Sequence, residues 1–200
     1  MLYGFLKGIL PTMFRIIYRA EVHGQENVPK EGGAIIAANH ISLWDPPFVG
    51  AFCPRRVSFM AKKELFENSV FSSIITSLGA FPVNRGAADR NAIKTALTVL
   101  GEGKCLGLFP EGTRSKNGNH MLPFHGGTFK SATKSKCTIL PFALIDSFKV
   151  LDHNGVEPVT VQLHYLKPIP YEEYKDMNTN EIAAMVHDRI ENKLVEVGAI

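Results

Sequence analysis

The sequence predicts a single-domain α/β sandwich, with a largely parallel, mixed sheet flanked by helices, and an N-terminal amphipathic helix that anchors it to a membrane. Apolar segments with strand character alternate with longer segments whose apolar residues recur at helical spacing, which is typical of a mainly parallel sheet covered by helices. The chain contains no linker-like stretch and no internal repeat, so we expect one domain. Its most apolar segment lies at the N-terminus.

The composition is that of a globular protein. Of the 200 residues, 45% are hydrophobic and 20% are charged, which excludes a disordered or fibrous chain. The formal net charge of +3 is compatible with anionic lipid or phosphate partners. Cys53, Cys105 and Cys137 are odd in number and lie in apolar contexts, so we expect buried, reduced thiols in a cytosolic compartment.

Short apolar or alternating runs indicate the strands of the sheet. Pro141 lies inside one of them and suggests an edge strand or an irregularity there, because proline cannot donate to a sheet ladder. The predicted strands span residues 21–24, 33–38, 56–61, 80–85, 105–109, 138–145 and 159–166.

Apolar residues at helical spacing indicate the helices between these strands. The clearest example is the C-terminal segment, where Ile182, Val186, Ile190 and Leu194 share one helical face. The predicted helices span residues 48–52, 66–78, 88–100, 126–135 and 179–197.

The first twenty residues form an amphipathic helical segment, which Pro11 is expected to kink or break. Cations inside the segment, together with this proline, argue against a membrane span of about 20 apolar residues. The segment can be a core-packing helix pair or an interfacial anchor whose Lys and Arg side chains face lipid phosphates. We favour the anchor, and therefore divide the chain into a membrane-associating segment, 1–19, and a main domain, 20–200.

A histidine and an aspartate follow one of the apolar strands. Residues 33–38 lead directly into Asn39 and His40, and Asp45 comes five residues after the histidine. We expect this pair on a loop at the carboxyl end of the strand, where ligands bind in open α/β sheets. An imidazole oriented by a carboxylate is suited to removing a proton from an alcohol.

Charged residues also follow three other predicted strands: Lys62, Arg85, and Glu111 with Arg114. If these strands are parallel neighbours, their ends share one rim of the sheet, and the cations suit a phosphate-bearing alcohol. Each feature alone has a simpler interpretation, as a solvated turn, a rim salt bridge, or a Glu111–Arg114 pair that braces a loop. His120 and His125 lack further ligands nearby, so we expect no metal site.

Five blocks of this sequence resemble the glycerolipid acyltransferase superfamily. Residues 39–45 resemble its NHxxxxD motif, and residues 109–115 match its FPEGTRS motif without a substitution. The order and spacing agree over roughly residues 20–165, most closely with the bacterial 1-acylglycerol-3-phosphate acyltransferases of the PlsC type. The family often has Asp where this chain has Asn84. The remaining blocks are 62–65 (KKEL), 80–85 (AFPVNR) and 139–142 (ILPF).

The resemblance implies transfer of a fatty acyl group from acyl-CoA or acyl carrier protein to the sn-2 hydroxyl of 1-acyl-sn-glycerol 3-phosphate, which gives phosphatidic acid. It assigns His40 as general base and Asp45 as its orienting carboxylate. No cofactor besides the thioester co-substrate is expected. Lys62, Arg85 and Arg114 are expected to bind the acceptor phosphate. Glu111 is expected to position Arg114 or the acceptor. Gly112 and Thr113, which belong to the same motif, are also expected to contact the substrate.

The lipid substrate implies a place in the cell. We expect a peripheral protein on the cytoplasmic face of the cell membrane, with lysophosphatidic acid, an acyl thioester and an anionic lipid surface as partners, and no nucleic acid. Three alternatives remain: an acyltransferase for glycerol 3-phosphate or another lysophospholipid, a thioester hydrolase that uses the same His-Asp pair, and a non-enzymatic lipid-binding protein.

Overall fold

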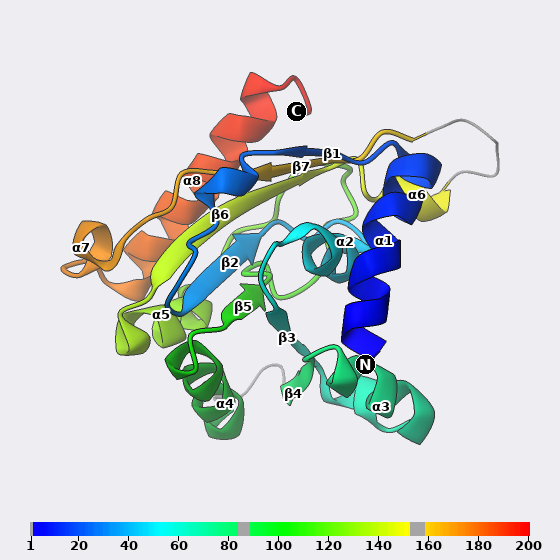
Figure 1. Cartoon of the computed structure of the whole chain (residues 1–200). Helices are drawn as coiled ribbons and strands as arrows, with labels where there is room; N and C mark the ends of the chain where they lie inside the picture. Colours follow the sequence, from blue (N-terminus) through cyan, green and yellow to red (C-terminus); the bar gives the residue numbers. More distant parts are fainter. Residues whose placement is uncertain (1, 84–88, 153–158) are drawn as a thin grey trace.

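The computed structural model describes residues 2–83, 89–152 and 159–200, which form one seven-stranded sheet with helices on both faces (Figure 1). The strand order across the sheet is β1-β7-β6-β2-β5-β3-β4. The strands are β1 (Glu21–His23), β2 (Ala34–Ala38), β3 (Val57–Lys62), β4 (Phe81–Val83), β5 (Cys105–Leu108), β6 (Thr138–Ile145) and β7 (Gln162–Tyr165).

The sheet is mixed and mostly parallel, as the sequence predicts. Strands β6, β2, β5, β3 and β4 run parallel to one another, whereas β7 is antiparallel to β6 and β1 is parallel to β7. The carboxyl ends of the five parallel strands therefore meet at one edge of the sheet, where the predicted functional residues follow β2, β3 and β5.

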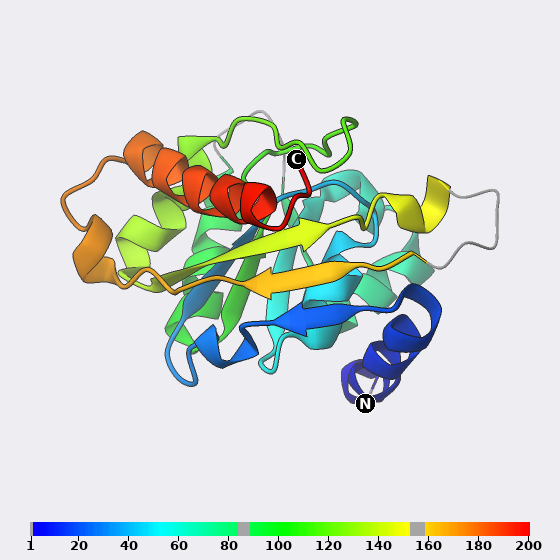
Figure 2. The ribbon, with the colours of Figure 1, turned by 90° about the horizontal axis from the view of Figure 1, so that it is seen from above.

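Two layers of helices cover the sheet, and the sequence of β2 explains why. All five residues of this strand are buried: Ile36 packs into the core with α1 (Leu2–Tyr18) and α2 (Asp45–Phe52), while Ile35 packs into the core on the other face. Figure 2 shows α1 and α8 on opposite sides of the sheet. The other helices are α3 (Ser69–Ser77), α4 (Arg90–Gly101), α5 (Lys130–Ser135), α6 (Lys149–Asp152), α7 (Tyr171–Tyr174) and α8 (Thr179–Glu196), with 3-10 turns at Gln25–Asn27, Lys63–Phe66 and Gly126–Phe129.

Helix α1 continues through Pro11, which excludes a break, one of the two predicted effects of this proline. Packing on both sides of the proline holds the helix together: Phe14 is fully buried against Phe48 of α2, with ring centroids 4.3 Å apart, and Lys7 donates hydrogen bonds to the C-terminal carbonyls of α2. Lys7 therefore points into the protein, not toward lipid phosphates as predicted. These contacts orient α2, which carries Asp45.

The opposite face of α1 is apolar and exposed. Phe5, Ile9 and Ile16 are 65%, 47% and 75% exposed. Their spacing places them on one side of the helix, away from the residues that pack on α2. No helix in the described part of the chain is long and apolar enough to cross a bilayer.

Strand β6 is an interior strand, which excludes the edge position that Pro141 suggested. It pairs with β2 on one side and β7 on the other. The proline falls where the β7 ladder is interrupted: its carbonyl accepts a hydrogen bond from Leu166 N at 3.0 Å, and the next pairing is the isolated bridge between Ile139 and Ile169. The missing N–H thus coincides with a local irregularity, the other predicted outcome.

The three cysteines, Cys53, Cys105 and Cys137, are buried and unbridged, as the sequence predicts.

Candidate active site

His40 and Asp45 are in direct contact at the carboxyl end of β2. The Nδ1 atom of His40 lies 2.7 Å from Oδ2 of Asp45. Asp45 is the first residue of α2, and not a loop residue as predicted, because Pro46 and Pro47 occupy the first turn of the helix, where a missing N–H costs nothing. The short connection between β2 and α2 turns the carboxylate back toward the imidazole.

The carboxylate of Asp45 is fully buried and accepts four hydrogen bonds. Besides His40, Oδ2 accepts from the backbone N–H groups of Ile41 and Ser42, at 2.7 and 2.8 Å, and Oδ1 accepts from Ser147 Oγ at 2.6 Å. A carboxylate in this role only accepts, so the proton of the His40–Asp45 hydrogen bond lies on Nδ1. Nε2 is then the basic nitrogen of the imidazole.

Two residues that follow β5 fix His40 from the other side. The ring of Phe109 stacks on the imidazole, with centroids 4.2 Å apart and an interplanar angle of 25°. Glu111 accepts hydrogen bonds from the backbone N–H groups of His40, at 2.6 Å, and Leu122, at 2.8 Å. Burial raises the pKa of the Glu111 carboxyl to about 7, aided by the charge of Asp45 and opposed by the two N–H donors.

Glu111 does not brace Arg114, which corrects the predicted pairing. Its two oxygens hold backbone groups, its side chain is buried, and the ion pairs found in the described ranges do not include Glu111 with Arg114. Glu111 instead ties the β2–α2 connection to the loop after β5. Asn39 has a similar function on the β6 side, because its amide exchanges two hydrogen bonds with the backbone of Leu144, at 2.7 and 2.8 Å.

A pocket of about 290 Å³ adjoins the His40 loop. Arg114 and Lys116 both line it, and two cations suit an anionic ligand. His40 itself is not part of the lining, but its neighbours Ile41 and Ser42 are. Of the other predicted substrate residues, Thr113 lines the pocket, while Gly112 and Glu111 are not part of its lining. The lining residues are Ile41, Ser42, Leu43, Thr113, Arg114, Ser115, Lys116, Gly118 and Phe148.

The remaining predicted residues lie at the same edge of the sheet or outside the described residues. Lys62 is exposed at the end of β3, two strands from β2, and is not part of the pocket lining. Arg85 and Asn84 lie outside the described residues. Gly112 has φ +69° and a Cβ there would lie 3.3 Å from His125, so glycine fits this turn best.

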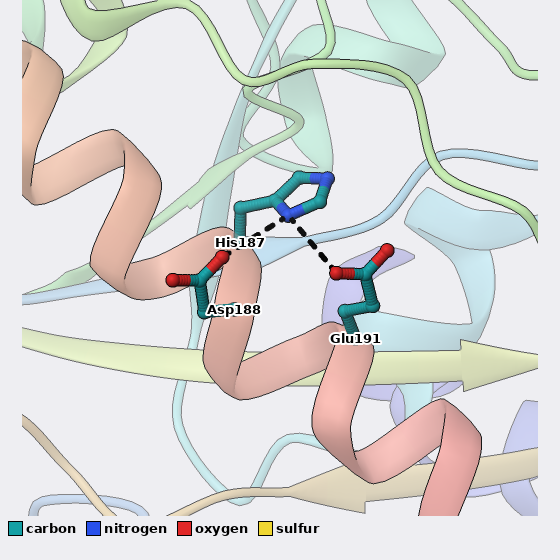
Figure 3. A group of neighbouring side chains, drawn as sticks. All are labelled: His187, Asp188 and Glu191. Atoms are coloured by element: carbon teal, nitrogen blue, oxygen red, sulfur yellow. Dashed lines mark ion pairs between the residues drawn. The ribbon is translucent and has the colours of Figure 1, made fainter.

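His187, Asp188 and Glu191 on α8 form the one group of three potential metal ligands among the residues the structure describes (Figure 3). His187 Nδ1 lies 3.7 Å from Asp188 and 3.9 Å from Glu191. Both carboxylates are exposed, so ion pairing along one helix accounts for the arrangement. His120 and His125 do not belong to it.

Sequence reasoning did not find Phe109 as the ring beneath His40, Lys116 as a pocket cation, or Ser147 as a partner of Asp45. Phe109 and Lys116 belong to or adjoin the FPEGTRS block, so their positions could have been inferred from it. Ser147 is 102 residues from Asp45, and no local pattern relates them.

Comparisons with known proteins identify the family of this chain. A family model described as Acyltransferase matches residues 19–145. The chain is 32% identical over 143 residues to the 1-acyl-sn-glycerol-3-phosphate acyltransferase of Bacillus subtilis, covering 71% of this chain and 70% of that protein. It is 30% identical over 191 residues to the Streptococcus pneumoniae protein of the same name, covering 94% of this chain and 70% of the relative.

A solved structure shows the same fold. The crystal structure of the 1-acyl-sn-glycerophosphate acyltransferase PlsC from Thermotoga maritima superposes with a TM-score of 0.83. The match covers 99% of this chain and 80% of that one, at 24% sequence identity. The family model spans more than half of the residues, and its boundaries include the His40–Asp45 pair and the Arg114 loop. The chain therefore belongs to the acyltransferase family.

Proposed function

We propose that this acyltransferase moves a fatty acyl group from an acyl thioester, carried on CoA or acyl carrier protein, to the sn-2 hydroxyl of 1-acyl-sn-glycerol 3-phosphate, giving phosphatidic acid. The names of the bacterial relatives support the acceptor. The observation that carries the proposal is the contact between His40 and buried Asp45 beside a pocket lined by Arg114 and Lys116.

The chemistry follows from the hydrogen bonds of His40. Asp45 holds the Nδ1–H, so Nε2 takes the proton of the acceptor hydroxyl as its oxygen attacks the thioester carbonyl. The imidazolium that forms is stabilised by the carboxylate. The tetrahedral intermediate collapses with departure of the thiolate, which receives a proton from the imidazolium. The substrate alcohol is the nucleophile, so no covalent enzyme intermediate is needed.

The pocket cations supply recognition of the acceptor phosphate. Arg114 presents a planar fork to phosphate oxygens and Lys116 a mobile point charge. Lys62 and Arg85 stay predicted contributors to the same headgroup. A phosphate held in this pocket brings the glycerol hydroxyls toward the adjacent His40 loop.

An acyl-transfer assay with an acceptor panel tests the proposal. Purified protein is given acyl-CoA or acyl carrier protein with 1-acylglycerol 3-phosphate, glycerol 3-phosphate, lysophosphatidylcholine or no acceptor. We expect phosphatidic acid from the first acceptor and little thioester consumption without an acceptor. Equal thioester consumption with and without acceptor would instead identify a hydrolase, and preference for another acceptor would replace the proposed substrate.

We also infer that the exposed face of α1 contacts the membrane surface, with the protein peripheral on the cytoplasmic side. Phe5, Ile9 and Ile16 present large apolar side chains to solvent on one helical face, which suits burial at the headgroup boundary. Residues 1–19 then serve two functions, because the other face of this helix packs on α2.

Binding to vesicles tests the membrane contact without unfolding the core. The variant with Phe5→Ser, Ile9→Ser and Ile16→Ser is compared with Val195→Ser, which alters an exposed apolar residue of α8. Vesicles of phosphatidylethanolamine and phosphatidylglycerol should retain the wild type and the α8 variant, but not the α1 variant. Equal co-sedimentation of all three would exclude this face. Deletion of residues 1–19 is a poor test, because it also removes buried Phe14.

A further inference from the structure

We propose that Ser147 is a positioning residue for the reaction, acting on His40 through Asp45; this inference rests on the proposed function. Ser147 is fully buried, and its hydroxyl donates to Asp45 Oδ1 at 2.6 Å. That oxygen is the one that His40 does not contact, since the imidazole is bound to Oδ2. The serine therefore holds the carboxylate from the side opposite the base.

The hydrogen bonds around Asp45 show why a fourth donor matters. The backbone N–H groups of Ile41 and Ser42 and the imidazole all converge on Oδ2. Within the described ranges, Ser147 is the one donor to Oδ1, so it fixes rotation of the carboxylate about its last bond and stabilises the negative charge in a buried site. Without it, one oxygen of a fully buried carboxylate loses its hydrogen bond.

The backbone that presents Ser147 is held in an unusual conformation. Asp146, the preceding residue, has φ +62°, in the left-handed region that aspartate enters more readily than most residues but that surrounding contacts must still hold. Asn119 compensates: its Oδ1 accepts from Asp146 N at 2.9 Å and its Nδ2 donates to Asp146 Oδ1 at 3.0 Å. Lys149 forms an ion pair with Asp146 Oδ2 at 2.8 Å. This turn directs the chain after β6 so that the Ser147 hydroxyl meets Asp45.

The consequence is a link between three segments that are distant in sequence. The loop after β5 supplies Asn119, the turn after β6 supplies Asp146 and Ser147, and the start of α2 supplies Asp45. Strained backbone is retained where the surrounding contacts hold it, and here those contacts lead to the proposed base.

The pH profile of kcat/KM for the Ser147→Ala variant tests this inference. Ser131→Ala is the matched control, because Ser131 is also a buried serine but belongs to α5. Removing a donor from Asp45 makes the His40–Asp45 pair bind a proton more readily. The acidic limb should therefore move up by about 1 pH unit, and kcat should fall on the order of tenfold. Neither substitution alters Glu111 or Asp146, the other acidic residues near the pair, so these residues do not account for a difference between the two variants. Ser131→Ala should leave the limb in place.

Two further variants separate positioning from stability. Ser147→Thr keeps the hydroxyl and should restore the acidic limb of the wild type. If the threonine variant does not fold, Ser147→Cys takes its place. Cysteine keeps the size of serine but is a weaker donor, so the acidic limb of this variant should lie between those of the wild type and Ser147→Ala. A fall in kcat with an unmoved acidic limb, or wild-type kinetics in Ser147→Ala, would overturn the inference. Failure of the proposed function is a separate result: the wild type itself would then not acylate 1-acylglycerol 3-phosphate.

Discussion

Phe109 lies flat against the imidazole of His40, with ring centroids 4.2 Å apart, and extends a stack that begins at Phe59 of β3. The rings of Phe59 and Phe109 are nearly parallel, and their centroids are 6.1 Å apart. The position of the proposed base thus depends on apolar packing across two strands as well as on its hydrogen bond to Asp45. Gly107 of β5 makes room for this stack, because it is paired with Phe59 in the sheet register.

Gly107→Ala should lower both stability and turnover. A Cβ at this position would lie 2.2 Å from Cε1 of Phe59, so the ring must move and the stack on Phe109 is disturbed. Overpacking of this kind costs about 1–3 kcal/mol of unfolding free energy. Urea unfolding and kcat measure the two effects. Gly127→Ala is the matched control, because nothing lies within 4 Å of its added Cβ. Wild-type kcat in a folded Gly107→Ala variant would show that the stack does not position His40.

Arg114→Ala should weaken the use of phosphate-bearing acceptors more than the use of the thioester. Arg114 lines the pocket next to the His40 loop, and its guanidinium is suited to phosphate. We expect KM for 1-acylglycerol 3-phosphate to rise at least tenfold, the equivalent of about 1.4 kcal/mol, with KM for the donor little changed. Lys136→Ala, which removes an exposed cation at the end of α5, is the control. Equal rises in both KM values would place Arg114 outside the acceptor site.

Much of this fold follows from local sequence patterns. The prediction has the correct limits for the 138–145 strand, because a buried strand is nearly all apolar, and the correct start for the C-terminal helix, because apolar residues recur along it at helical spacing. In the structure, Asn178 and Glu181 form a capping box at that start. The contact between His40 and Asp45 spans only five residues, so a short connection after the strand brings the two side chains together.

The predictions that the structure corrects concern residues whose partners are distant in sequence. Lys7 turns inward because the C-terminus of α2, more than 40 residues away, offers carbonyl acceptors. Pro141 is compatible with an interior strand because β7 has an irregularity at that point, which the sequence of β6 alone does not reveal. Glu111 binds the backbone of His40, 71 residues earlier, and not its neighbour Arg114. Such pairings depend on strand order, which local patterns do not specify.

Glu111 should impose a pH dependence on stability. Its pKa is raised from 4.5 to about 7 in the folded protein, so between these values the native state retains a proton that the unfolded chain releases. The carboxyl therefore favours folding below pH 4.5, and this contribution is lost as pH rises through 7. Glutamine at this position does not titrate, so Glu111→Gln lacks this pH-dependent contribution. The unfolding free energy of the variant minus that of the wild type should therefore be on the order of 2–3 kcal/mol larger at pH 8 than at pH 4.5.

Urea unfolding of both proteins across this range measures the difference. Glu26→Gln, which changes an exposed glutamate of the turn after β1, should follow the wild type at every pH. A constant difference between Glu111→Gln and wild type would mean that the buried carboxyl does not titrate in this range.

The rate of acyl transfer to 1-acylglycerol 3-phosphate by His40→Ala tests the central claim most directly. Removing a positioned general base should lower kcat by about 10²–10⁴-fold while the protein stays folded and still binds the acceptor. His23→Ala, at the far edge of the sheet, should retain activity. A loss of this size in His40→Ala alone supports His40 as the base, whereas near-normal turnover in that variant would contradict the account.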